Sequence, residues 1–289
     1  MRKTKLFFIN GIILTITALS MRGIGLIFNI YVANKVGSEA IGIFSLLMSV
    51  YGFAITVATS GIGIACSCIV SEEFAKKNYL TGLKAVKTSI IFAILLGISS
   101  SILIIFFAPL ISSTWLKNMV SRTPLYLIAF GLPLISVSSV IGGYFSSVEK
   151  AYKSAISQIL ETSVKIVATV CLLYFNPSKD VESICIFLIL ADVISEIFSF
   201  GLNIIFYLVD RRKYISKRSL PVQMKKRIFT IAFPISVTSC IRSGLSSLKQ
   251  FLIPIRLELS GISYSLAVSN YGLINRNGYA CYYVCKCLN

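Results

Sequence analysis

Residues 88–116 read TSIIFAILLGISSSILIIFFAPLISSTWL and contain no charged side chain. A helix needs about 20 predominantly apolar residues to cross the hydrocarbon core of a bilayer. A spanning segment takes the helical form because a helix satisfies its own backbone hydrogen bonds where water is absent. This stretch therefore predicts a transmembrane helix.

Six further apolar stretches lie before and after this one, so we expect seven spans. Segment 40–70 is also free of charge, whereas segment 156–175 is interrupted by Glu161 and Lys165. We expect the first turns of that segment to lie in the cytosol, where a Glu–Lys pair at i,i+4 is mildly favourable. The predicted spans are residues 6–33, 40–70, 88–108, 125–147, 156–175, 183–209 and 228–254.

The composition of the whole chain agrees with this pattern. Its 289 residues are 56% hydrophobic and 13% charged, with a mean hydropathy of +0.83, whereas charged residues make up about a quarter of a soluble domain. The expected fold class is all-α: a polytopic helical membrane protein, with an N-terminal six-helix lobe of a two-lobe transporter, a seventh helix and a truncated eighth.

The absence of histidine weakens most enzyme interpretations. Histidine is the commonest general base and the commonest zinc ligand, and the chain has none. Three cysteines crowd the C-terminal end, Cys281, Cys285 and Cys287, but three ligands without histidine do not predict a metal site. We therefore expect no enzyme activity, no catalytic residue, no cofactor and no metal.

The net charge of +17 does not indicate a nucleic-acid partner, because the basic residues are scattered between apolar runs. Basic residues gather in cytoplasmic loops of membrane proteins. With the N-terminus inside, most of the basic loop residues fall on the cytoplasmic side, including the cluster at 211–227. The sequence therefore predicts a multi-pass cell-membrane protein with a cytoplasmic N-terminus.

The long basic loop also divides the chain into expected parts. Residues 1–209 form a six-helix transmembrane lobe, and 210–227 a basic cytoplasmic inter-lobe loop. Residues 228–275 begin a second lobe with a seventh helix and an outer loop, and 276–289 form an aberrant tail. The loop also fits a topogenic anchor on anionic lipid, and the two roles can hold together.

Arg22 and Arg242 lie inside predicted spans, far from any charged neighbour on the N-terminal side. An ionised side chain near the bilayer centre costs about 2.5–3.5 kcal/mol on insertion scales, so such residues usually face a cavity or a partner. Two guanidinium groups from different halves of the chain would form a receptor for phosphate or carboxylate. Lys249 is a secondary candidate for contact with an anionic headgroup.

Asp192 and Glu196 lie within the sixth predicted span, four residues apart and so on one helix face. One interpretation makes them the charge partners of the two arginines. Another makes them sites of H⁺ or Na⁺ coupling. A buried salt bridge or a cavity lining is an equally good interpretation.

Glycine pairs predict close helix contacts. Ser60-Gly61-Ile62-Gly63 and Gly142-Gly143 would let neighbouring backbones approach. Ordinary membrane packing accounts for them better than a ligand role does.

The sequence resembles the stage V sporulation protein B family of lipid-linked oligosaccharide and polysaccharide flippases, within the multidrug/oligosaccharidyl-lipid/polysaccharide exporter superfamily. The order and spacing of several short motifs carry the likeness, which extends to Asn275. The motifs lie in residues 22–51, 60–62, 70–75, 142–145, 155–161 and 241–250.

The resemblance implies two six-helix lobes around a cationic central cavity that alternates between the membrane faces. It implies a lipid-linked sugar diphosphate as the substrate, with membrane lipid around its tail. Arg22 and Arg242 fall on matching basic positions of the first and seventh helices. Relatives commonly carry a second basic residue where this chain has Asn29, and an Ile-Pro and a Lys where it has Gly63 and Cys68, which implies a less cationic cavity.

The amino-acid pattern at the end of the sequence differs from that of the preceding apolar spans. Codons that encode residues 276–289, read one nucleotide later, give an apolar continuation of an eighth helix, so we hypothesise a one-nucleotide frameshift just after Asn275. Such a chain would hold one lobe and a seventh helix, which supplies half of an alternating-access cavity.

The leading interpretation is a flippase-type transporter that moves a lipid-linked peptidoglycan or polysaccharide precursor by alternating access, for spore cortex or cell-wall synthesis. A cation-coupled multidrug exporter of the same superfamily is the first alternative, and the arginine pair argues against it. A non-transporting scaffold or an inactive truncated membrane protein is the second. A membrane transferase ranks last, because no acidic pair lies at a loop mouth to activate a sugar-phosphate donor.

Overall fold

The computed structural model describes residues 2–59, 61–117, 119–175, 180–214 and 224–277. This description leaves out the side chains of 274–277 and several of the first helix, including that of Arg22. So does the expected tail beyond Asn277, with its three cysteines. The elements are α1 (Arg2–Val36), α2 (Ser38–Thr59), α3 (Ile62–Ala75), α4 (Tyr79–Leu110), η1 (Ile111–Trp115), α5 (Thr123–Ser147), α6 (Ala151–Phe175), α7 (Val181–Arg211), η2 (Arg212–Tyr214), α8 (Met224–Leu259) and α9 (Tyr264–Asn277).

Six of the predicted spans are present as long apolar helices. Within the described residues, six segments are long and apolar enough to cross a membrane, and they coincide with the spans predicted from residue 40 onward. The first predicted span, 6–33, lies on the 35-residue helix α1. The all-α polytopic class is therefore confirmed, and the described residues contain no β-strand.

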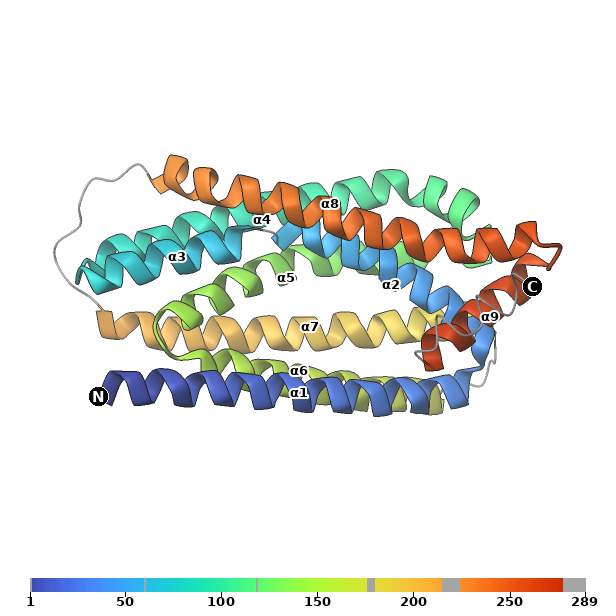
Figure 1. The fold of residues 1–289 in the computed structure, drawn as a ribbon, viewed down its shortest axis with the longest axis horizontal. Helices are drawn as coiled ribbons and strands as arrows, with labels where there is room; N and C mark the ends of the chain where they lie inside the picture. The colour runs from blue at the N-terminus through green and yellow to red at the C-terminus, as the bar shows by residue number, and fades with distance from the viewer. Residues whose placement is uncertain (1, 60, 118, 176–179, 215–223, 278–289) are drawn as a thin grey trace.

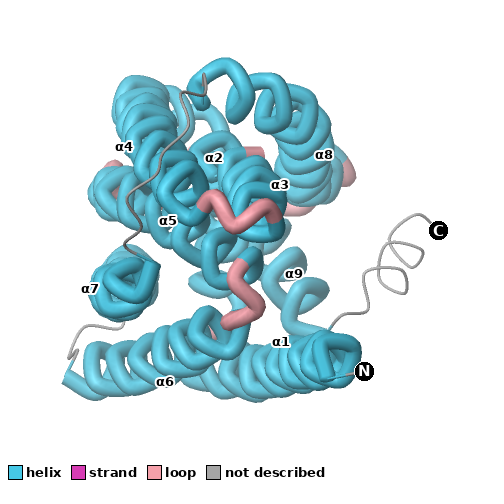
Figure 2. Tube along the Cα trace, turned by 90° about the vertical axis from the view of Figure 1, so that its left-hand side faces the viewer, coloured by secondary structure: helices cyan, strands magenta, loops and turns pink. Residues whose placement is uncertain are grey.

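The helices form an elongated bundle whose long axis follows the helix axes (Figure 1). Helix α8 lies along one side and α1 with α6 along the other, and α7 packs next to α6. Figure 2 shows the bundle end-on, with α2, α3 and α5 close together near α8. Helix α1 packs chiefly against α6, and α8 packs against α2, α3, α4 and α9.

The second span is broken at Gly61. Sequence alone predicted one continuous helix over 40–70, whereas the structure has α2 and α3 joined at this glycine, whose φ of 75° lies in the left-handed region. A side chain at Gly61 would also collide with the Ala232 carbonyl and the Ser236 hydroxyl of α8. Glycine therefore allows both the turn and the close approach of α8.

The third span ends in a π-helical turn. Helix α4 contains Pro109, and the five residues that follow Leu110 form η1. Proline lacks the backbone N–H that an α-helix would use and its ring crowds the preceding turn, which favours a wider turn nearby. The helical segment thus extends beyond the predicted end at residue 108.

Connections 76–78 and 148–150 and the short helix η2 lie at one end of the bundle, which we call the basic end (Figure 1). There the fully buried Asp210 of α7 accepts bonds from Lys150 at 2.7 Å, Lys153 at 3.1 Å and the Tyr144 hydroxyl at 3.0 Å. Because a buried carboxylate needs cations and donors around it, this cluster joins α5, α6 and α7.

Helices α3 and α5 touch backbone to backbone. A side chain at Gly143 would collide with the Gly63 carbonyl, and one at Gly63 would come within 2.8 Å of the Ser139 hydroxyl. The close contact expected for the two glycine motifs is thus present.

We predict that Gly143→Ala lowers the thermal midpoint of the protein in detergent, because overpacking of a close contact costs about 1–3 kcal/mol. The matched control is Gly142→Ala, whose Cβ would lie 3.6 Å from the Ser154 hydroxyl, an ordinary contact. Both changes gain the same helix propensity. Equal midpoints for the two variants would contradict the close contact.

Candidate functional site

A polar cavity of about 880 Å³ lies between α2, α3, α5 and α8. Hydroxyl side chains dominate its wall, and three of its lining residues, Gly61, Gly63 and Gly143, lie where helices approach closely. Arg242 is the one charged residue among the described residues that line it. The hydroxyl residues are Thr56, Thr59, Ser67, Ser139, Ser146, Ser239, Ser243 and Ser246.

The sequence of α8 places Arg242 in this wall. Arg242 and Ser243 follow Ser239 by three and four residues, and Ser246 follows them by four and three, so the four share one helix face. The Ser243 and Thr56 hydroxyls lie 3.0 Å apart, which fixes this face of α8 against α2. Lys249 is exposed on the same helix, seven residues beyond Arg242, and so extends the same face.

The chemistry of the polar cavity suits an oxyanion that carries hydroxyl groups. A guanidinium binds phosphate or carboxylate through two parallel N–H donors. The surrounding hydroxyls both donate and accept hydrogen bonds. The described lining residues include no Asp or Glu to neutralise Arg242, so the cavity has a net positive charge.

Arg22 and Arg242 lie on helices in different parts of the bundle. Helix α1 packs against α6 on one side, whereas α8 lies on another side in both views (Figures 1 and 2). The side chain of Arg22 is outside the described part of the structure. The two-arginine receptor therefore stays a prediction.

Asp192 and Glu196 find partners on two different helices. The Asp192 carboxylate, 5% exposed, forms an ion pair with Lys165 of α6. The Tyr51 hydroxyl of α2 donates to Glu196, whose second carboxylate oxygen faces Gly131 of α5. Within the described residues, the cation paired with Asp192 is thus a lysine and not an arginine.

Lys165 is the residue that sequence reasoning missed. The sequence placed it in the cytosol beside Glu161, but it pairs with Asp192 between two spans. A lysine in the middle of an apolar stretch was the available signal. The direction in which it points depends on how α6 packs on α7, which a sequence pattern does not give.

Lys165 also lines a second polar cavity, of about 460 Å³, between α1, α2, α6, α7 and α8. Asn29, the residue where relatives are expected to be basic, lines it too, as does Gln250. The hydroxyls of Ser49 and Thr169 in this wall are buried and have no hydrogen-bond partner among the described residues.

Comparison with known sequences identifies relatives over nearly the whole chain. The sequence profile described as polysaccharide biosynthesis protein matches residues 8–275. Stage V sporulation protein B of Bacillus subtilis (strain 168) is 26% identical over 272 residues, which are 92% of this chain and 52% of that protein. Sporulation protein YkvU of the same strain is 22% identical over 279 residues, which are 92% of this chain and 59% of that protein. The chain thus spans about half the length of these curated relatives.

Solved structures share the fold. One is a MOP superfamily transporter from Pyrococcus furiosus, for which a reversed polarity of the binding pocket is described. It matches with a TM-score of 0.67 and 15% identity, over 89% of this chain and 60% of its own. An inward-facing multidrug resistance MATE family transporter matches with a TM-score of 0.63 and 16% identity over 86% of this chain and 56% of its own. The helices described above therefore follow the arrangement of this superfamily.

We predict that Lys165→Met lowers the thermal midpoint, because it leaves the buried Asp192 carboxylate without its cation, a loss of at most about 3–5 kcal/mol. The double variant Lys165→Met/Asp192→Leu should recover most of that loss, since it leaves no unpaired carboxylate. A double variant no more stable than the single one would contradict the pairing.

Proposed function

This chain belongs to the polysaccharide biosynthesis protein family, and on that premise we propose that it is a flippase-type membrane transport protein. Its cargo is a lipid-linked peptidoglycan or polysaccharide precursor, which crosses the cytoplasmic membrane without covalent chemistry. The protein is on this proposal not an enzyme.

The observation that carries the proposal is the polar cavity with Arg242 in its wall. A lipid-linked sugar diphosphate presents phosphate oxygens and many hydroxyls, and the cavity presents a guanidinium and a ring of Ser and Thr hydroxyls. Its volume of about 880 Å³ falls within the range of ligand pockets, about 300–1,000 Å³. Lys249 on the same face of α8 is a secondary contact, and Arg22 is the expected second guanidinium.

An apolar groove beside the cavity supports a lipid cargo. It measures about 480 Å³ and lies between α2, α4 and α8, with Phe53, Phe107 and Leu248 in its wall. Its two serines, Ser100 and Ser247, donate to the carbonyls of Ala54 and Ser49, so their hydroxyls are satisfied and the groove presents hydrocarbon. A polar headgroup and a prenyl tail would thus find matching surfaces on two sides of α8.

The relatives support the two-lobe arrangement. Residues 1–209 would form the first lobe, 210–227 the connecting cytoplasmic loop and 228–275 the start of the second lobe, since these relatives are about twice as long. Alternating access would then move α8 against the first lobe. The names of the relatives suggest a role in sporulation, such as cortex or cell-wall synthesis.

The orientation proposed places the N-terminus and the basic end in the cytoplasm of the cell. Lys and Arg enrichment in short loops sets orientation in membrane proteins. The lysines of connections 76–78 and 148–150 belong to the basic end, as do the described basic residues 211–213 and 225–227.

A cation-coupled multidrug exporter is the second candidate function. It is favoured by the fold shared with a multidrug transporter and by the carboxylates of Asp192 and Glu196, which would bind H⁺ or Na⁺. These carboxylates lie away from the polar cavity, whose described wall has an arginine and no acid. A cationic drug would be repelled there, so the flippase is the better proposal.

We predict that Arg242→Ala weakens binding of a polyprenyl diphosphate-linked sugar by about tenfold or more, because a hydrogen bond to a charged group contributes about 1.5–3 kcal/mol. Arg242→Lys should retain part of the affinity. Native mass spectrometry of the purified protein, with phosphatidylglycerol as a competing lipid, measures both.

The matched control is Arg256→Ala, which removes one exposed positive charge from the far end of the same helix. It should bind as the unchanged protein does. Equal affinity in the Arg242→Ala variant would exclude the polar cavity as the headgroup site.

A further inference from the structure

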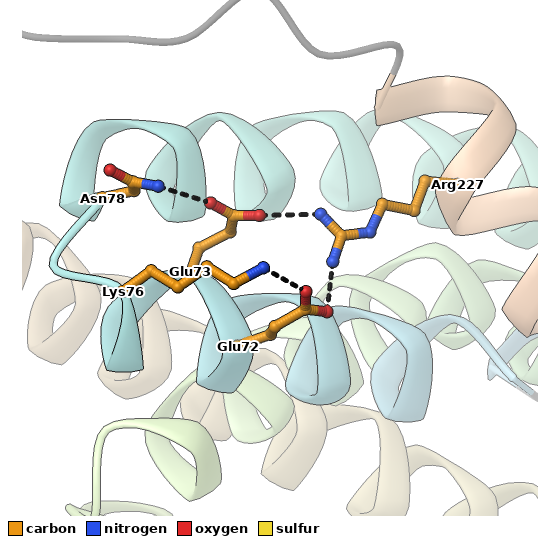
Figure 3. A network of polar contacts seen from close by, with 5 residues as sticks. All are labelled: Glu72, Glu73, Lys76, Asn78 and Arg227. Atoms are coloured by element: carbon orange, nitrogen blue, oxygen red, sulfur yellow. Dashed lines mark hydrogen bonds and ion pairs between the residues drawn. The ribbon is translucent and has the colours of Figure 1, made fainter.

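An arginine at the start of α8 binds two adjacent carboxylates at the end of α3 (Figure 3). Nη1 of Arg227 donates to Glu73 at 2.7 Å, and its Nη2 donates to Glu72. Glu72 and Glu73 lie in the last turn of α3, and Arg227 in the first turn of α8. One side chain therefore joins two helices that are far apart in the sequence.

The two carboxylates are held in place by their own neighbours. Glu73 is 4% exposed, and its second oxygen accepts a bond from the Asn78 amide at 3.3 Å. Lys76 donates to Glu72 at 2.6 Å. A buried carboxylate without a cation is strongly destabilised. The buried Glu73 therefore needs its contact with Arg227 as long as α8 packs on α3.

The same two helices both contribute to the wall of the polar cavity. Ser67 and Cys68 of α3 and Ser239 and Arg242 of α8 line it. Arg227 and the two carboxylates lie beyond these residues toward the basic end, where α3 ends and α8 begins (Figure 1). The ionic cluster therefore holds the cavity walls together at that end.

A weaker ionic contact fastens the opposite end of α8. Lys117, after η1, pairs with Glu258 and lies 4.6 Å from the centroid of the Tyr264 ring. The Lys117 and Glu258 side chains are 42% and 32% exposed, so water screens this pair. At the basic end, by contrast, Arg227 has two carboxylates and one of them is buried.

We propose that Arg227, Glu72 and Glu73 form a latch that closes the polar cavity toward the basic end, and that this latch must open before the cavity can take a headgroup from that side. The inference rests on the proposed function, because it assigns a gate to the same cavity. In the proposed orientation the latch is the cytoplasmic gate. The two ion pairs of Arg227 favour the closed state at this end.

Cys68 provides a reporter of this gate. It is an exposed free cysteine in the cavity wall on α3. The experiment uses the whole chain with every other cysteine replaced, carried in membrane vesicles. A membrane-impermeant maleimide is added on the side of the basic end, which an epitope tag at the N-terminus identifies. The measurement is the rate at which Cys68 is labelled.

We predict that Arg227→Gln speeds this labelling by about tenfold, because loss of the latch shifts the closed–open equilibrium toward the open state. The charge-swapped variant Arg227→Glu/Glu73→Arg should return the rate to that of the parent. Lys226→Gln is the matched control, since it removes one exposed positive charge from the same turn, and it should label slowly.

Unchanged labelling in Arg227→Gln would overturn the latch, as would equal acceleration in Lys226→Gln, which would show a general effect of charge. Where Arg227→Gln fails to fold, the charge-swapped variant decides, because fast labelling in a folded swap contradicts the ion pair. Headgroup binding by the parent protein is measured in a separate experiment. A failed latch therefore leaves the proposed function standing, and a failed headgroup assay leaves the latch testable.

Discussion

The absence of water in the hydrocarbon core constrains every part of this structure. Backbone N–H and C=O groups must be paired within the helices, which is why the described residues are almost continuous helix. Hydroxyl side chains follow the same rule, as when Ser136 and Ser147 donate to the carbonyls four residues earlier. With the backbone groups paired within each helix, helices associate through close backbone contact, and Gly63 and Gly143 provide it.

Charged side chains obey this constraint by pairing across helices. Asp210 joins α7 to Lys150 and Lys153, Asp192 joins α7 to Lys165, and Glu73 joins α3 to Arg227. Each pair uses residues distant in sequence, so each fixes the relative position of two elements. Arg242 differs from this group, because its surroundings in the cavity are hydroxyls. A cation with no described carboxylate in the same cavity wall is the basis on which we propose that the polar cavity binds an anionic headgroup.

Sequence reasoning predicted the helices because long apolar runs leave few other structures open to the chain. It did not predict the break at Gly61, because the reason for a glycine there is the close approach of Ala232 from α8, a contact between residues distant in the sequence. It also missed the pairing of Lys165, because helix rotation is set by tertiary packing. The Ser239–Arg242–Ser243–Ser246 spacing carried a signal for the cavity wall, but serines are common in transmembrane helices. Arg242 itself was predicted from the cost of its charge, and it does line a cavity.

The broken second span has a mechanical consequence. An unbroken helix transmits tilt along its whole length, as a rigid rod does. The turn at Gly61 divides this rod into two shorter levers, α2 and α3, which meet near the middle of the span. The lever α3 carries the carboxylates at its tip and part of the cavity wall along its side. A tilt of α3 at one membrane face therefore need not be passed on to α2, which packs against α9 toward the other face.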